Sequence, residues 1–166
     1  MVEMDAKQLT ELLNKNWMTH DAMWFLHCMQ ECGMEKANKI NKAAVRSMAM
    51  IEAMRLSRAL GMETVANYED FKKLFEGAAD LVMPDFMKFT YSFRDDGVIH
   101  AEWQSCFAHE GMKKIGMIDQ YECGIFERIN AWLDALKIRY TVSPLVQGCM
   151  MHNEGQCYRD YQLLFD

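Results

Sequence analysis

The spacing of apolar residues changes once along this 166-residue chain, and the change limits the folds open to it. Up to about residue 65 they recur every three or four positions, as at Leu9, Leu13 and Trp17, which indicates amphipathic helices. Over residues 85–93 they alternate with polar residues, which indicates a half-buried strand. The sequence therefore predicts helices first and a sheet second.

Capping signals divide the N-terminal part into separate helices. Asp5 and Gln8 have the spacing of a capping box, and Gly33 is suited to end a helix. The polar residues 20–21 are expected to break the chain between the first two helices. Asn67 then begins a shorter helix that follows the third.

The second half begins with a hairpin. Residues 95–97 supply its turn, and the return strand is expected to run to Phe107, with Cys106 and Trp103 on opposite faces. A capping box at Asp119 is expected to start the next helix.

Cys123 is then expected in the first turn of that helix. Two further strands, over about 138–149 and 157–165, form the second hairpin. We expect an α+β fold in which N-terminal helices pack on an antiparallel sheet made of two hairpins separated by a helix. Residues 1–166 are expected to form one domain, helical over about 5–80, with sheet and helix over about 84–166.

Composition excludes several classes of protein. The net charge is −6, and no basic patch is present, so nucleic acid is not expected as a partner. The start of the chain is acidic and lacks the apolar run of a signal peptide, and no apolar stretch reaches the roughly 20 residues that span a bilayer. We expect a soluble, cytoplasmic protein with no membrane partner, in which cysteines stay reduced.

Four cysteines in the second half are the candidate site: Cys106, Cys123, Cys149 and Cys157. A thiol in the first turn of a helix is close to free backbone N–H groups, which favour the thiolate, and this is the position expected for Cys123. Cys149 and Cys157 are expected at facing ends of the second hairpin. Two other cysteines, Cys28 and Cys32, lie on an apolar helix face and are expected in the core.

Thiolates suit zinc, which takes about four ligands in a tetrahedron. Cys106 is the natural fourth ligand beside the other three cysteines, and His109 and His152 are alternative fourth ligands. Four thiolates would equally hold an iron–sulfur cluster. The spacing lacks the paired C-x-x-C of common zinc ribbons, and buried inert thiols remain the alternative.

Two groups of residues carry a resemblance to a known family. Residues 21–25, 33–37, 51–53 and 60–61 are similar to the D-G-x-W-F, G-x-E-x-A, I-E-A and L-G opening of a family of uncharacterised prokaryotic proteins. The four candidate cysteines fall where that family's cysteines fall. This family is distantly similar to the L-2-amino-thiazoline-4-carboxylate hydrolase-like proteins and to the 4-vinyl reductase small-molecule-binding domains.

The resemblance implies a zinc site. In domains of the vinyl-reductase type, zinc is held by a cysteine at a helix start, a glutamate and two cysteines near the C-terminus, and Cys123, Cys149 and Cys157 match these cysteines. Val146 stands where the glutamate is expected, which favours Cys106 as the fourth ligand.

We therefore expect a domain that binds a small organic molecule between helices and sheet and is braced by a cysteine-ligated zinc. One alternative is a hydrolase that opens a small heterocycle, with Cys123 or metal-bound water as nucleophile and His109 or His152 as base. An iron–sulfur redox protein is another. The 16 methionines also allow a homodimer through the N-terminal helices.

Overall fold

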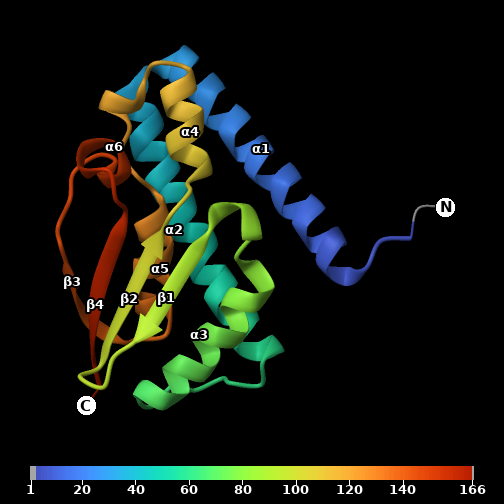
Figure 1. Ribbon diagram of the computed structural model, residues 1–166, viewed down its shortest axis with the longest axis vertical. Coiled ribbons are helices and arrows are strands. Elements are labelled where there is room, and N and C mark those ends of the chain that lie inside the picture. The colour runs from blue at the N-terminus through green and yellow to red at the C-terminus, as the bar shows by residue number, and fades with distance from the viewer. Residues whose placement is uncertain (1–2, 166) are drawn as a thin grey trace.

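The computed structural model describes residues 3–165 and confirms the α+β fold, with N-terminal helices preceding a four-stranded antiparallel sheet (Figure 1). The helices are α1 (Ala6–Cys32), α2 (Met34–Ala59), α3 (Tyr68–Val82), α4 (Phe107–Lys114), α5 (Ile125–Ala135) and α6 (Met150–Glu154), with 3₁₀ turns η1 (Asp85–Met87) and η2 (Ile118–Gln120). The strands are β1 (Phe89–Phe93), β2 (Val98–Trp103), β3 (Arg139–Ser143) and β4 (Tyr158–Leu164), in the order β1-β2-β4-β3.

The N-terminal helices begin and end largely where the capping signals place them. The Asp5 carboxylate accepts a hydrogen bond from the Gln8 backbone N–H at 2.8 Å, and the Gln8 side chain accepts one from the Asp5 N–H at 3.0 Å. Gly33 separates α1 from α2 with a φ of 82°, a value that favours glycine. The predicted break at residues 20–21 is wrong, because α1 runs through these two exposed residues without interruption.

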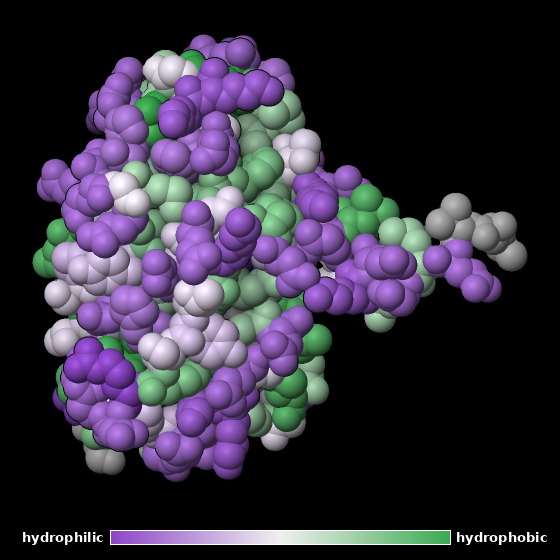
Figure 2. All heavy atoms as spheres, in the orientation of Figure 1, coloured by the Kyte–Doolittle hydropathy of each residue, from purple (hydrophilic) through white to green (hydrophobic). Residues whose placement is uncertain are grey.

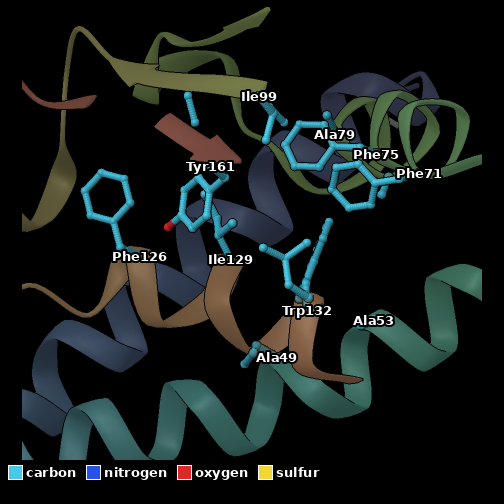
Figure 3. Close-up of a cluster of buried hydrophobic side chains, with 14 of the residues drawn as sticks. Ala49, Ala53, Phe71, Phe75, Ala79, Ile99, Phe126, Ile129, Trp132 and Tyr161 are labelled. Atoms are coloured by element: carbon cyan, nitrogen blue, oxygen red, sulfur yellow. The ribbon is translucent and has the colours of Figure 1, made fainter. Parts of the chain in front are cut away.

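The first hairpin has the predicted faces. Tyr91 on β1 pairs with Ala101 on β2, and Ile99, Ala101 and Trp103 are buried on one side of the sheet. That face is covered by aromatic residues of α3 and by α5, and Phe75 of α3 lies 6.2 Å from Trp132 of α5 between ring centroids. Figure 3 shows α5 side chains directed toward the sheet, with α2 on the far side of α5. The core therefore lies between the sheet and the α3 and α5 layer.

Several elements of the second half differ from the prediction. The strand predicted over 85–93 begins only at Phe89, because Asp85–Met87 forms the 3₁₀ turn η1. The return strand ends at Trp103, and Cys106 precedes α4 instead of lying on the strand. Asp119 lies in η2, while α5 begins later, after Gly124, so Cys123 is outside its first turn. The strand predicted over 138–149 ends at Ser143.

The β3–β4 connection contains α6, which replaces the turn expected between long strands. The two strands still pair as antiparallel neighbours, with Val142 opposite Tyr161. Cys149 and Cys157 flank α6 and the loop after it, so this insertion, and not strand pairing, sets their separation. Within residues 3–165, no helix has the length and apolar character needed to cross a membrane.

Candidate metal centre

Each of the four candidate cysteines lies just before an element of secondary structure. Cys106 precedes α4, Cys149 precedes α6 and Cys157 precedes β4, while Cys123 lies two residues before α5. The first three are buried, and Cys123 is partly exposed, with its side chain against the core. The fold thus gathers cysteines from four connections that are far apart in the sequence.

The four thiols lie within electrostatic range of one another. Burial, together with a smaller effect of charge on the neighbouring cysteines, raises the pKa of Cys123 and that of Cys157 to about 12. The pKa of Cys106 is also raised by burial, and charge on Cys149 would add to the effect. Every pair among the four interacts in this way, which identifies them as one group.

Backbone N–H groups oppose the effect of burial at two of these thiols. The N–H of Ile125 lowers the pKa of Cys123, and the N–H groups of His109 and Ala108 lower that of Cys106, although Cys106 forms no standard capping bond with α4. Burial is the larger effect at both. Burial therefore opposes the thiolate character expected of Cys123, which weakens the sequence argument for Cys123 as a ready nucleophile.

Arg159 is a buried cation beside this group. Its side chain is on the inner face of β4, and the residue is only 5% exposed. One guanidinium nitrogen donates to the Tyr158 carbonyl at 2.6 Å and lies 3.1 Å from the Met150 sulfur, and the guanidinium carbon is 4.2 Å from the Phe126 ring centroid. No carboxylate among residues 3–165 pairs with it.

The residues that Arg159 contacts are close in the sequence to the cysteines. Met150 follows Cys149 directly, Phe126 is three residues from Cys123, and Arg159 itself is two residues from Cys157. The guanidinium also lowers the pKa of Cys157. An unpaired buried cation is costly, so an anion at the cysteine group would stabilise it.

The two histidines considered as fourth ligands make contacts outside the cysteine group. His109 is buried in α4, and its Nδ1 lies 3.0 Å from Glu110 Oε1. His152 Nε2 lies 2.9 Å from Asp119 Oδ1. Val146, at the position of the expected glutamate, lies in the connection between β3 and α6. Cys106 is the candidate that shares the environment of the other three cysteines.

The four thiols are suitable ligands for a thiophilic metal, but they are not arranged closely enough to bind one ion. Four buried or core-facing thiols with a nearby cation suit zinc or an iron–sulfur cluster. Among residues 3–165, no three Cys, His, Asp or Glu side chains are already placed to hold one ion. Ligation would require the thiols to draw together from these positions.

A separate apolar pocket lies between α1 and α2. Its volume is about 220 Å³, and Asp21 and Asn41 are its polar residues. Cys28 faces this pocket and Cys32 is also partly exposed, so neither is in the core as the sequence suggested. The remaining lining residues are apolar: Trp17, Trp24, Phe25, Ala37, Ile40, Ala44, Val45 and Met48.

Comparison with known families places the chain in one of them. Residues 2–124 match the model described as a family of unknown function (DUF6125), which is well over half of the chain. The chain belongs to this family. The match includes Cys106 and Cys123 and ends before Cys149 and Cys157. No curated protein and no solved structure matches the chain.

Membership in DUF6125 agrees with the predicted resemblance to an uncharacterised family. The family description assigns no reaction, ligand or metal to its members. The similarity to thiazoline hydrolases and to vinyl-reductase domains has no support from these comparisons.

Arg159 is a residue near the cysteine group that was not predicted from the sequence. The alternation of Cys157, Arg159 and Tyr161 along one strand was the available signal, because residues two apart share a face of the sheet.

Proposed function

We propose that this protein is a small-molecule-binding domain whose C-terminal half is braced by one metal ion, most suitably zinc, bound to Cys106, Cys123, Cys149 and Cys157. The observation that carries the proposal is the electrostatic proximity of four thiols, one of which, Cys157, lies beside a buried arginine that pairs with no carboxylate among residues 3–165. A Zn²⁺ ion with four thiolates carries a net charge of −2, which supplies the anion that Arg159 lacks.

The bound metal would act as a structural link. The four cysteines precede α4, α5, α6 and β4, so one ion would tie together four connections that are far apart in the sequence. A closed set of four protein ligands leaves no position for substrate, which is the arrangement of structural zinc sites. The metal would therefore stabilise the fold instead of activating water.

The small molecule has its best support in the pocket between α1 and α2. That pocket is largely apolar, and three aromatic residues line it. Ligand sites in proteins typically combine such a lining with a small number of polar groups, here Asp21 and Asn41. This location replaces the one expected between helices and sheet.

Metal analysis of untagged protein purified without oxygen tests the proposal. We expect about one zinc per chain, lost in Cys123→Ser, Cys149→Ser and Cys157→Ser and retained in Cys28→Ser, the matched control. Loss in Cys106→Ser would assign the fourth ligand. Iron with inorganic sulfide would favour the iron–sulfur alternative, and a metal-free protein with four freely titrating thiols would refute the site.

The pocket needs its own test, and 8-anilinonaphthalene-1-sulfonate is a suitable probe because its fluorescence rises in apolar sites. We expect saturable binding that Ala44→Trp abolishes by filling the pocket. Leu145→Ala, which changes an exposed residue elsewhere, is the control. Equal binding by both variants would refute the pocket as the site.

A further inference from the structure

Helix α1 exposes an unusual amount of apolar surface. It is 27 residues long, and none of its residues is buried. Six of its large apolar side chains are between 37% and 63% exposed: Leu9, Leu12, Leu13, Trp17, Met23 and Trp24. Contiguous exposed apolar surface on a folded protein typically marks an interaction site.

Helix α2 adds a second apolar stripe. Five small or apolar residues that are exposed recur at alternating spacings of four and three: Ile40, Ala44, Ser47, Ile51 and Met54. This is the spacing of the contact line between two packed helices. The opposite side of α2 carries its buried residues, such as Ala49 and Ala53, and the exposed stripe meets α1 across the apolar pocket, at Ile40 and Ala44.

The two stripes form one surface, which we call the α1–α2 face. The helices meet at Gly33 and diverge toward the N-terminus of α1, which projects from the body (Figure 1). Trp17 and Trp24 of α1 and Ile40 and Ala44 of α2 line the same pocket, so the stripes are continuous there. In Figure 2, hydrophobic side chains are visible on the projecting half of α1.

We propose that a second copy of this chain covers the α1–α2 face, forming a twofold dimer in which α1 of each copy packs along α2 of the other. This arrangement goes beyond the metal-braced domain and does not depend on the metal. It also covers the outer side of the apolar pocket, which would then be enclosed by helices of both copies.

Charge favours pairing α1 with the partner's α2. Helix α1 contains three acidic and two basic residues, whereas α2 contains two acidic and six basic residues. Packing α2 against the α2 of a second copy would oppose like charges, and packing α1 against α2 brings opposite net charges together. In a twofold dimer both copies use the same α1–α2 face, so α1 of each copy contacts α2 of the other and the α1–α2 contact occurs twice.

The available area matches that of a stable dimer. A 27-residue helix is about 40 Å long and about 10 Å wide, so its footprint is about 400 Å². Each copy contributes one such footprint through its α1 and a second through its α2, so about 800 Å² of each copy would be buried. Standard interfaces bury about 800 Å² on each partner.

Sedimentation velocity of the full-length, metal-loaded protein tests the dimer. We expect wild type to be a dimer at about 10 µM, and Ile51→Glu and Leu13→Glu to weaken dimerisation by about 100-fold or more, since each change occurs twice at a symmetric interface. Both positions are more than half exposed, so the monomer should keep its helical circular dichroism.

Leu145→Glu is the matched control, because this residue is 85% exposed and lies outside the α1–α2 face. We expect it to remain a dimer. A wild-type protein that stays monomeric up to about 200 µM would overturn the proposal and assign the face to another occupant. Dimers of unchanged affinity in both Ile51→Glu and Leu13→Glu would also overturn it. Loss of zinc without loss of the dimer would affect only the proposed metal site.

Discussion

Arg128 on α5 donates two hydrogen bonds to the Glu52 carboxylate on α2, from Nε at 2.8 Å and from Nη2 at 2.6 Å. Trp132 Nε1 donates a third to the same carboxylate at 2.9 Å. Both charged side chains are nearly buried, with 11% and 15% of their surfaces exposed. This network holds α2 on the outer side of α5 and thereby fixes the helix that connects to α1.

Replacing Glu52 with Gln should destabilise the protein by about 3 kcal/mol, because it leaves a buried guanidinium without its counter-charge. Urea unfolding of the two proteins measures the difference. The exposed pair Lys42–Glu122 provides the comparison, since Glu122→Gln should cost less than about 1 kcal/mol. Equal losses for the two variants would show that burial of the first pair has no energetic consequence.

Replacing Arg159 with Met should affect the metal-loaded and metal-free proteins differently. Without metal, the change removes an unpaired buried cation, and stability should be unchanged or higher. With metal, it removes the cation next to an anionic centre, and zinc affinity should fall by about 10-fold or more. Competition against a fluorescent chelator measures this affinity.

The exposed residue Arg55 serves as the control for Arg159, and Arg55→Met should change neither zinc affinity nor stability. An Arg159→Met protein with wild-type zinc affinity would separate this arginine from the metal site. Loss of folding in both metal states would instead assign Arg159 a purely structural role.

Zinc binding should release close to four protons at pH 7.5. Burial raises the pKa of Cys123 and of Cys157 to about 12 and also raises that of Cys106, so these thiols are protonated in the metal-free protein. Each must lose its proton on ligation, and zinc affinity therefore rises as the pH rises. Calorimetric titrations in buffers with different ionisation enthalpies count the protons released.

The proton count also distinguishes the candidate fourth ligands. A neutral histidine releases no proton when it binds zinc, so ligation by His109 or His152 would reduce the count to about three. Cys106→Ser should reduce it by one if Cys106 is a ligand and leave it unchanged if it is not. Release of fewer than two protons would contradict ligation by several cysteines.

Gly97 should tolerate no side chain in the turn of the first hairpin. Its φ is +81°, and an added Cβ would lie 3.1 Å from Gln162 Nε2, which donates to the Asp96 carbonyl. Gly97→Ala should therefore cost about 1–2 kcal/mol in thermal or urea unfolding. Gly111→Ala is the matched control because it lies in α4 with no atom near the added Cβ, and it should stabilise the protein by up to about 1 kcal/mol. Similar effects at both positions would refute the role assigned to the turn.

Several strictly local patterns allowed correct predictions, although the capping box expected at Asp119 did not. The capping box at Asp5, the alternation through β1 and the turn at Gly97 each depend on residues within a few positions of one another. Segments near the cysteines were harder, because α4 and α6 have only eight and five residues. Such short helices show too little periodicity to be separated from strands or turns.

Local patterns in the chain were enough to predict the fold class, the order of helices and hairpins, and the four candidate cysteines. The contacts of the folded chain were needed to show that the four thiols lie within electrostatic range of one another, that burial raises the pKa of Cys106, Cys123 and Cys157, and that Arg159 lies beside Cys157. Burial and charge proximity depend on contacts between segments that are distant in the sequence. Periodicity reports which face of an element is apolar, but it does not report which elements meet.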